Sequence, residues 1–170
     1  MASTFGSMSA TPVHSLPSDL PLDPASVTAS VPAGELSAAT GSYKILLVDG
    51  NLHFVNSVKN VLRGLADVAV VGSAANRTQA WAMAEALCPD LVLLDFATPE
   101  MNGLEVAAQM QTWSVVPSFV FLSQSDDAAY REAAHRAGAT GFVIKSNLVL
   151  DLIPLIERQV ALKAMKGNRP

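Results

Sequence analysis

Short runs of consecutive apolar residues recur along the chain, and several of them end at a single polar residue. The clearest runs are Ile45–Val48, which is followed by Asp49, and Leu91–Leu94, which is followed by Asp95. A continuous apolar run of this length is typical of a strand buried on both faces, as in parallel sheets that are covered by helices. The sequence therefore favours an α/β fold with a buried parallel sheet.

Between these runs, apolar residues recur at the spacing of amphipathic helices. The expected strands are residues 45–48, 68–71, 91–94, 119–122 and 142–144, and the expected helices are residues 54–65, 76–87, 103–111, 126–137 and 151–165. Pro154 fits the last helix only in its first turn, because proline lacks the N–H that a helix interior uses. Because crossovers between parallel strands are right-handed, this alternation predicts a parallel sheet with helices on both faces.

The first 42 residues differ in composition from the rest of the chain. They contain no Lys or Arg, 5 of the 10 prolines and 13 Ser or Thr residues, and their apolar residues follow no strand or helix period. Such a segment buries too little apolar surface to offset its conformational entropy. We expect a disordered tail over residues 1–42, a folded domain over 43–166 and a short tail over 167–170. A docking segment or a target for Ser/Thr modification is the alternative interpretation of the first tail.

The composition also excludes several classes of function. The 170-residue chain has a net charge of −4. This charge gives no indication of the clustered basic face that proteins use to bind nucleic acid. Its single cysteine, Cys88, excludes an internal disulfide and fits a reducing compartment. No stretch approaches the roughly 20 apolar residues that span a membrane, and the N-terminus lacks the pattern of a secretory signal. We expect a cytoplasmic protein that binds neither nucleic acid directly nor membrane.

Four polar residues lie at the ends of four expected strands: Asp49, Asp95, Ser123 and Lys145. In a parallel α/β sheet the reactive groups collect beyond the carboxyl ends of the strands, so we expect these side chains to converge. Two close carboxylates repel each other, and a hard cation such as Mg²⁺ relieves the repulsion. The lysine offers a charge, and the hydroxyl a hydrogen bond, to a phosphate oxygen. The set predicts a site where a carboxylate attacks a phosphoryl donor.

Each of these residues has a simpler interpretation when it is taken alone. An aspartate at a strand end more often caps a helix or begins a turn, a lysine there is usually a solvated charge, and Ser123 could begin a Ser/Thr turn. Their joint placement favours the functional interpretation.

Two other α/β classes of protein fit this sequence poorly. A flavodoxin would need a phosphate-binding loop where GNLHF stands. A haloacid-dehalogenase phosphatase would need an acid in place of Ala97.

Four stretches carry a resemblance to a known family. KILLVDGN, DLVLLDFATPEMNGLEV, FVFLSQSDD and AGATGFVIKS resemble the receiver domain of bacterial response regulators, and the resemblance covers about residues 43–165. It implies a flavodoxin-like fold with five parallel strands in the order 2-1-3-4-5. It also implies that Asp95 accepts a phosphoryl group from a histidine kinase or a phosphotransfer protein. The protein would then be a signalling switch and not an enzyme.

The same resemblance implies the roles of the other site residues. Lys145 becomes the charge partner of the phosphate, and Ser123 becomes the hydroxyl that moves to bond it. Phe142 falls where the family has an aromatic switch residue, although an ordinary core role is an equal alternative for it. Asp49, Asp95 and the backbone carbonyl of Ala97 would be the ligands of Mg²⁺. Pro99 and Gly103 would shape the loop that follows Asp95.

One position departs from the family pattern. Receivers normally have two adjacent acids after the first strand, and here the pair is Asp49-Gly50. Because the affinity of oxygen-ligand sites depends on ligand charge, we expect weak Mg²⁺ binding. Asn51 and Glu100 are nearby residues that could compensate. Two hypotheses therefore stay open: a receiver switched by phosphate on Asp95, and a pseudo-receiver that binds proteins without phosphorylation.

The resemblance also indicates partners. In receivers, the face formed by the fourth helix, fifth strand and fifth helix changes its affinity for a downstream protein, and it often supports a homodimer. Leu148–Ile156 is similar to receivers that carry a helix-turn-helix domain, but only KGNRP follows the last expected helix. We therefore expect a receiver without an output domain, which acts in a phosphorelay through protein contacts.

Overall fold

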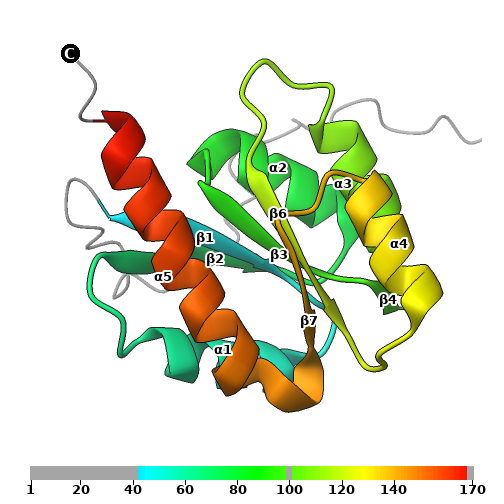
Figure 1. Ribbon diagram of the computed structural model, residues 1–170. Coiled ribbons are helices and arrows are strands. Elements are labelled where there is room, and N and C mark those ends of the chain that lie inside the picture. Colours follow the sequence, from blue (N-terminus) through cyan, green and yellow to red (C-terminus); the bar gives the residue numbers. More distant parts are fainter. Residues whose placement is uncertain (1–41, 99–100, 168–170) are drawn as a thin grey trace, which may run out of the picture. The chain divides into compact units, whose positions relative to one another are not determined.

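The computed structural model describes residues 42–98 and 101–167, which contain one five-stranded parallel sheet with the strand order β2-β1-β3-β6-β7 (Figure 1). The strands are β1 (Tyr43–Val48), β2 (Val68–Ala74), β3 (Leu91–Asp95), β6 (Ser118–Ser123) and β7 (Gly141–Ile144), and a short antiparallel pair comprises β4 (Ala97–Thr98) and β5 (Met101–Asn102). The helices are α1 (Leu52–Leu62), α2 (Arg77–Leu87), α3 (Gly103–Met110), α4 (Ala128–Arg136) and α5 (Leu148–Gly167), with a 3₁₀ turn at Lys145–Asn147 before α5. The predicted flavodoxin-like sheet and its strand order 2-1-3-4-5 are confirmed, with β6 and β7 as its fourth and fifth strands.

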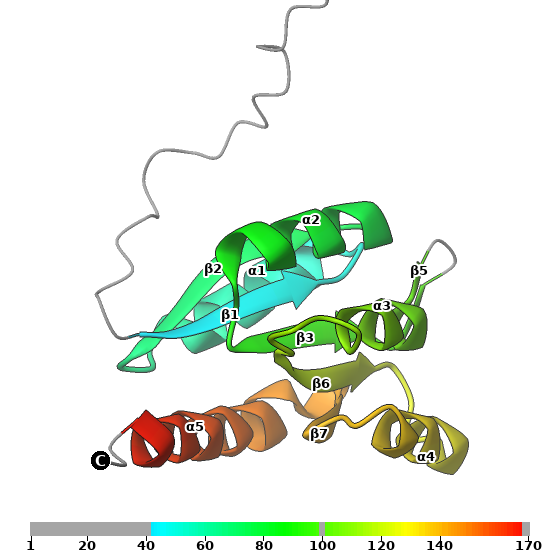
Figure 2. The same cartoon turned by 90° about the horizontal axis from the view of Figure 1, so that it is seen from above.

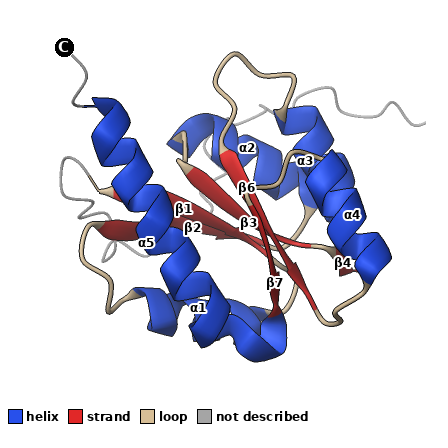
Figure 3. Ribbon diagram, viewed as in Figure 1, coloured by secondary structure: helices blue, strands red, loops and turns tan. Residues whose placement is uncertain are grey.

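The two faces of the sheet are covered by different helices. Leu46 and Val48 of β1 pack with side chains of α2, α3 and α4 on one face. Ile45 and Leu47 of the same strand pack with α1 and α5 on the other face. Figure 2 shows the strands in succession from β2 to β7, and Figure 3 shows the helices that flank them. Because both faces are covered, adjacent strand residues are all buried, and the strands are therefore continuous apolar runs.

Polar side chains fix where several helices begin. The side-chain oxygen of Asn51 accepts hydrogen bonds from the backbone N–H groups of His53 and Phe54 at the start of α1. Asn76, Asn102 and Asp127 cap α2, α3 and α4 through bonds to Gln79, Leu104 and Ala129. These caps satisfy backbone donors that have no partner inside the helix. They place the helix N-termini at the carboxyl ends of the strands.

The structure differs from the sequence prediction in several boundaries. The first helix ends at Leu62 and not at residue 65, while β2 extends to Ala74 and not only to residue 71. The last helix begins at Leu148, three residues before its predicted start, so Pro154 lies in its second turn. The prediction that Pro154 occupies the first turn is therefore wrong. The missing N–H would have bonded the carbonyl of Leu150, a residue that is exposed and open to water.

Some predictions fall on residues that the structure does not describe. The predicted disordered tail lies outside the described residues except for Ser42, and the short C-terminal tail lies outside them except for Gly167, which ends α5. Pro99 and Glu100 also lie outside them. In the described part of the chain, no helix combines the length and apolar character that crossing a membrane requires.

Gly103, the first residue of α3, lies close against the backbone of β3. A Cβ at this position would overlap the backbone carbonyl oxygen of Asp95 and lie 3.2 Å from the ring of Phe121. We expect Gly103→Ala to lower the free energy of unfolding by about 1–3 kcal/mol, because neither the backbone nor the buried ring can yield easily. Gly50→Ala is the matched control, since its Cβ would meet only the carbonyl oxygen of Ala75, at 3.6 Å. Denaturant unfolding should show a much smaller change for the control, and equal effects would contradict this explanation.

Candidate functional site

The four polar residues predicted to converge do lie at one edge of the sheet. Asp95 and Ser123 are the last residues of β3 and β6, and Asp49 follows β1 directly. Lys145 follows β7 and begins the 3₁₀ turn that leads into α5. Asp49, Asp95 and Ser123 are all buried, which is rare for polar side chains without partners. The order of the parallel strands therefore brings together residues that are up to 96 positions apart in sequence.

The ammonium group of Lys145 joins the two carboxylates. Its Nζ atom donates a hydrogen bond to Asp49 Oδ2 at 2.6 Å and lies 2.8 Å from Asp95 Oδ1. Only 7% of the Lys145 side chain is exposed, and the exposed fractions of Asp49 and Asp95 are 2% and 4%. The other oxygen of Asp49, Oδ1, accepts the backbone N–H of Asn51 at 2.8 Å. The three charges thus form one buried cluster, and the alternative of a solvated surface lysine is wrong.

The electrostatics of this cluster act most clearly on Asp95. Burial raises the pKa of Asp95 above its ordinary value of 3.8. The hydrogen bond and charge of Lys145 lower this pKa, while the neighbouring charge of Asp49 raises it, and the net direction is upward. Burial disfavours the charged form because it removes water from the carboxylate. Asp95 is therefore the acid whose ionisation costs the folded protein stability.

Ser123 is close to this cluster but is engaged elsewhere. Its hydroxyl donates a hydrogen bond to the carbonyl of Ser125 at 3.0 Å and accepts the Ser125 N–H at 3.3 Å. This is the Ser/Thr turn that the simpler interpretation of Ser123 predicted. The residue is still positioned at the carboxyl end of β6, next to the strand that carries Asp95. The structure thus shows the turn, while the role of Ser123 as a switch hydroxyl stays a prediction.

The comparison with known proteins agrees with this geometry. The family described as "Response regulator receiver domain" matches residues 45–157, which is more than half of the chain. The chain belongs to the response regulator receiver family. Its receiver domain is the signal-receiving part of two-component signalling.

The proteins that are similar to this chain include both response regulators and enzymes. The nitrate/nitrite response regulator protein NarL of Escherichia coli is 34% identical over 117 residues, covering 69% of this chain and 54% of NarL. A protein-glutamate methylesterase/protein-glutamine glutaminase of Saccharophagus degradans is 30% identical over 106 residues, covering 62% of this chain and 29% of that protein. This chain spans about half or less of the length of these relatives. A receiver domain is not itself an enzyme, and the methylesterases carry further domains.

A solved receiver structure confirms the fold. The signal receiver domain of the response regulator NarL from Mycobacterium tuberculosis superposes with a TM-score of 0.65 at 26% identity. The match covers 71% of this chain and 97% of that domain. The receiver fold is therefore shown both by sequence and by structure.

The donor set for a metal is reduced in this receiver. Receiver domains typically bind Mg²⁺ at the phosphorylation site, and Asp49 and Asp95 lie close enough to share one cation, as their common contact with Lys145 shows. Ala97 begins β4 just beyond Asp95. Among the described residues, no group of three His, Cys, Asp or Glu side chains is placed to hold a metal. The residues fit a divalent cation, with two carboxylates in place of the usual three.

Neither Asn51 nor Glu100 is shown to replace the carboxylate that Gly50 lacks. The side-chain oxygen of Asn51 is occupied by the two N–H groups that it caps at the start of α1. Glu100 lies outside the described residues. Asn51 therefore acts on the site through its backbone N–H, which bonds Asp49.

The predicted aromatic switch, Phe142, lies in a cluster of aromatic rings. It is half-buried, and its ring packs edge-on against Phe96 with centroids 6.0 Å apart. Phe96 follows Asp95 directly and stacks on Tyr130 of α4 at 4.5 Å. The Arg131 guanidinium lies over the Phe142 ring, 4.9 Å from its centroid. These contacts connect the acceptor strand with α4 and β7.

Sequence reasoning missed Phe54, which the structure brings to the site. Its ring centroid lies 4.5 Å from the ammonium nitrogen of Lys145. In the sequence, Phe54 is one apolar position of the helix expected over residues 54–65. The available signal was its place in the first turn after the Asn51 cap, because that turn borders the carboxyl end of β1.

The raised pKa of Asp95 predicts a pH-dependent gain in stability for Asp95→Asn. The folded state holds a proton on Asp95 more tightly than the unfolded state does, so ionisation of Asp95 destabilises the folded state. This destabilisation is complete at pH values above the raised pKa of the folded state, and it is absent at pH values below 3.8, the ordinary pKa. At pH 7 we expect Asp95→Asn to raise the unfolding free energy, because the variant removes an ionisation that costs the folded state stability. The difference from wild type should narrow as the pH falls, which denaturant unfolding at several pH values can follow.

Two further variants check this electrostatic explanation. Lys145→Met leaves two buried carboxylates without their counter-charge and should lower the unfolding free energy by about 3–5 kcal/mol. Asp67→Asn changes an exposed acid and should have an effect within about 0.5 kcal/mol at every pH. A constant gain for Asp95→Asn across the pH range would contradict the proposed cause.

Proposed function

We propose that this receiver accepts a phosphoryl group on Asp95 from a histidine kinase or a phosphotransfer protein. The observation that carries the proposal is the buried Asp95 carboxylate at the end of β3, with the Lys145 ammonium 2.8 Å from its Oδ1 atom. A carboxylate with an adjacent fixed cation is suited to attack a phosphoryl group and to bear the added charge. Membership of the receiver family supports the same role.

In the proposed transfer, a carboxylate oxygen of Asp95 forms a bond to phosphorus. The bond from phosphorus to the histidine nitrogen of the donor breaks, and its electron pair returns to the imidazole. Lys145 offsets the negative charge that the transferring oxygens bring beside Asp49 and Asp95. Catalysis here consists of positioning and electrostatic stabilisation, because the protein has no further bond to make.

We propose that Asp49, Asp95 and the backbone carbonyl of Ala97 hold Mg²⁺, and that they hold it weakly. When bound, the metal neutralises charge on the phosphoryl oxygens. Gly50 supplies no carboxylate, so the site has fewer charged ligands than receivers with two adjacent acids. The Lys145 ammonium also competes for the same two carboxylates, since it contacts both. Phosphorylation should therefore demand a high metal concentration.

Ser123 and Phe142 are the proposed switch residues. To bond a phosphoryl oxygen, the hydroxyl of Ser123 must exchange its bond to the Ser125 carbonyl for the new acceptor. This exchange releases the turn between β6 and α4. Phe142 then follows the displaced loop, and its contacts with Phe96 and Arg131 connect the change to α4. The result is a population shift that a new charge drives.

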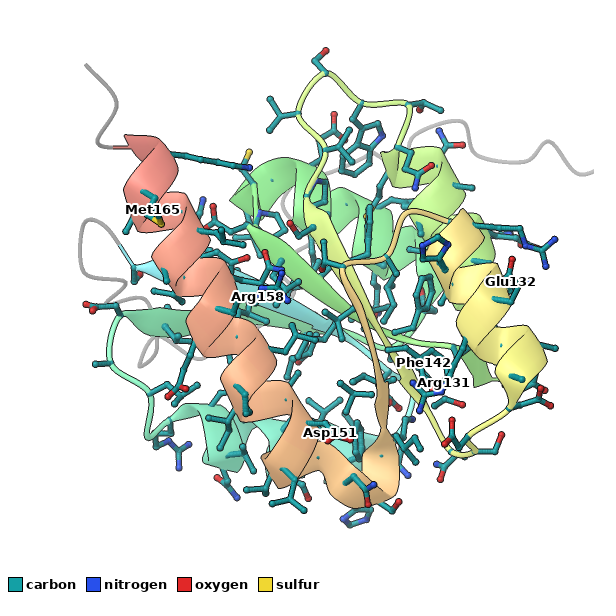
Figure 4. All side chains as sticks on the ribbon, in the orientation of Figure 1. Arg131, Glu132, Phe142, Asp151, Arg158 and Met165 are labelled. Atoms are coloured by element: carbon teal, nitrogen blue, oxygen red, sulfur yellow. The ribbon has the colours of Figure 1, made fainter. Side chains whose placement is uncertain are left out.

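The surface that we propose to respond is formed by α4, β7 and α5. Figure 4 labels six of its side chains: Arg131, Glu132, Phe142, Asp151, Arg158 and Met165. A groove of about 520 Å³ lies between α4 and β7, lined by residues that include Arg131 and Phe142. Each of the two helices carries side chains of both charges, which is compatible with a self-complementary contact between two copies. A downstream protein or a second copy of this chain is the proposed partner, in the cytoplasm and without direct contact to nucleic acid.

A pseudo-receiver is the second candidate function. Gly50 and the Lys145 ammonium that already bridges both carboxylates are the observations that favour it. In this case the same surface would bind partners without phosphorylation. The joint presence of Asp95, Ser123 and Lys145 favours the phosphorylated receiver.

Incubation with acetyl phosphate and Mg²⁺ tests the proposed chemistry. Wild-type protein should gain the mass of one phosphoryl group at millimolar Mg²⁺, which intact-mass measurement detects, and Asp95→Ala should gain none. No gain by the wild type, or an undiminished gain by the variant, would sink the proposal.

The metal dependence can be tested in the same reaction with Gly50→Asp. Position 50 has space for a side chain, since a Cβ there would meet only the Ala75 oxygen at 3.6 Å. The added carboxylate should lower the Mg²⁺ concentration for half-maximal phosphorylation by about tenfold, equivalent to about 1.4 kcal/mol of binding free energy. Gly50→Ala is the matched control and should retain the wild-type metal dependence. An unchanged dependence in Gly50→Asp would refute the explanation from Gly50.

The proposed switch surface can be mapped with a phosphoryl mimic. Beryllofluoride with Mg²⁺ should move the amide resonances of Arg131, Phe142 and Asp151 more than those of Thr78 on α2. Ser123→Ala should reduce these changes, because it removes the hydroxyl that follows the phosphoryl group. Changes confined to the loops around Asp95, with a bound mimic, would favour the pseudo-receiver instead.

A further inference from the structure

The Lys145 ammonium has an aromatic neighbour as well as two acidic ones. Asp49 Oδ2 and Asp95 Oδ1 lie 2.6 and 2.8 Å from Nζ, and the ring centroid of Phe54 lies 4.5 Å from it. We infer that Phe54 is a positioning residue, which holds this ammonium between the two carboxylates through the face of its ring. The inference deepens the proposed function, and its kinetic part rests on that function.

The position of Phe54 is fixed by its backbone and by its packing. Its N–H donates to the side-chain oxygen of Asn51 at 3.1 Å, within the first turn of α1. Its half-buried side chain packs against the core cluster shared by α1 and α5. Asn51 also donates its own N–H to Asp49. One short segment thus sets the place of both the ring and one carboxylate, so the distance between them is defined by local structure.

The environment strengthens this contact. A cation over an aromatic ring is attracted by the negative face of the ring, and the attraction is stronger where water is excluded. Only 7% of the Lys145 side chain is exposed, so its ammonium is largely desolvated. The residue after Asp49 is Gly50, which brings no second acid to the ammonium. Phe54 therefore adds an aromatic contact to the two acidic contacts of this ammonium.

The ring contact also suits a cation that must change partners. When a phosphoryl group binds Asp95, the ammonium must turn from the carboxylates to a phosphoryl oxygen. A hydrogen bond is directional, whereas the attraction of a ring face tolerates a shift of the cation across it. Phe54 therefore keeps the ammonium within reach before and after the transfer. A leucine at this position would fill similar space without that attraction.

A series of fluorinated phenylalanines at position 54 tests the inference. One, two and three ring fluorines weaken the negative ring face step by step while they leave size and apolar character nearly unchanged. At saturating Mg²⁺, where competition between the ammonium and the metal no longer limits the reaction, the rate of phosphorylation by acetyl phosphate should fall with each fluorine, by about fivefold over the series. The same series at Phe119, which is buried in the core on the opposite face of the sheet, is the matched control and should leave the rate unchanged.

A readout that needs no phosphorylation separates this inference from the proposed function. In wild type, the ε-methylene protons of Lys145 should resonate upfield of those of other lysines, because the ammonium nitrogen next to them lies over the ring. Phe54→Leu should remove this shift, and Phe54→Tyr should retain both the shift and most of the phosphorylation rate.

The outcomes are distinct. An upfield signal with no phosphorylation of the wild type would sink the proposed function and support the placement of the ammonium. Phosphorylation with a rate that ignores the fluorine series, or a Lys145 signal that Phe54→Leu does not move, would overturn the positioning role.

Discussion

The contact of one ammonium with two buried carboxylates determines much of this structure. Because β1 and β3 are neighbours in the sheet, Asp49 and Asp95 must lie side by side at its edge. A cation between them offsets the cost of burying both charges, and Lys145 provides it from the end of β7. Buried ion pairs contribute little net stability, so this arrangement is better explained by the chemistry that it permits. When both acids are ionised, the single charge of Lys145 leaves one negative charge uncompensated. A divalent cation would be attracted to this remaining charge.

Much of the fold could be predicted from the sequence, because its causes are local. Continuous apolar runs identified the strands, and the rule for right-handed crossovers turned their alternation into a parallel sheet. The same topology predicts that Asp49, Asp95, Ser123 and Lys145 lie at one edge of the sheet. The fine strand order came from the family resemblance, since no local pattern states which strands are neighbours.

Other features could not be predicted, because they depend on contacts between distant segments. The helical periodicity marked Phe54 as apolar, but only tertiary packing brings its ring to the Lys145 ammonium. Proline propensity placed Pro154 in a first turn, and the extended start of α5 at Leu148 overrode that preference. The β4–β5 pair has strands of two residues each, too short to leave a periodic pattern. These features depend on tertiary contacts, which local sequence patterns do not specify.

Asn51 links the reactive edge to the secondary structure beside it. Its N–H holds Asp49, while its side chain holds the first turn of α1. The border of the site on this side is therefore a capped helix and not a loop. A protein that approaches there meets a surface that is already ordered, so association loses little entropy from freezing backbone. For a protein that docks on this side, selectivity would depend on the shape and chemistry of exposed residues such as Leu52, which can be substituted without altering the buried site itself.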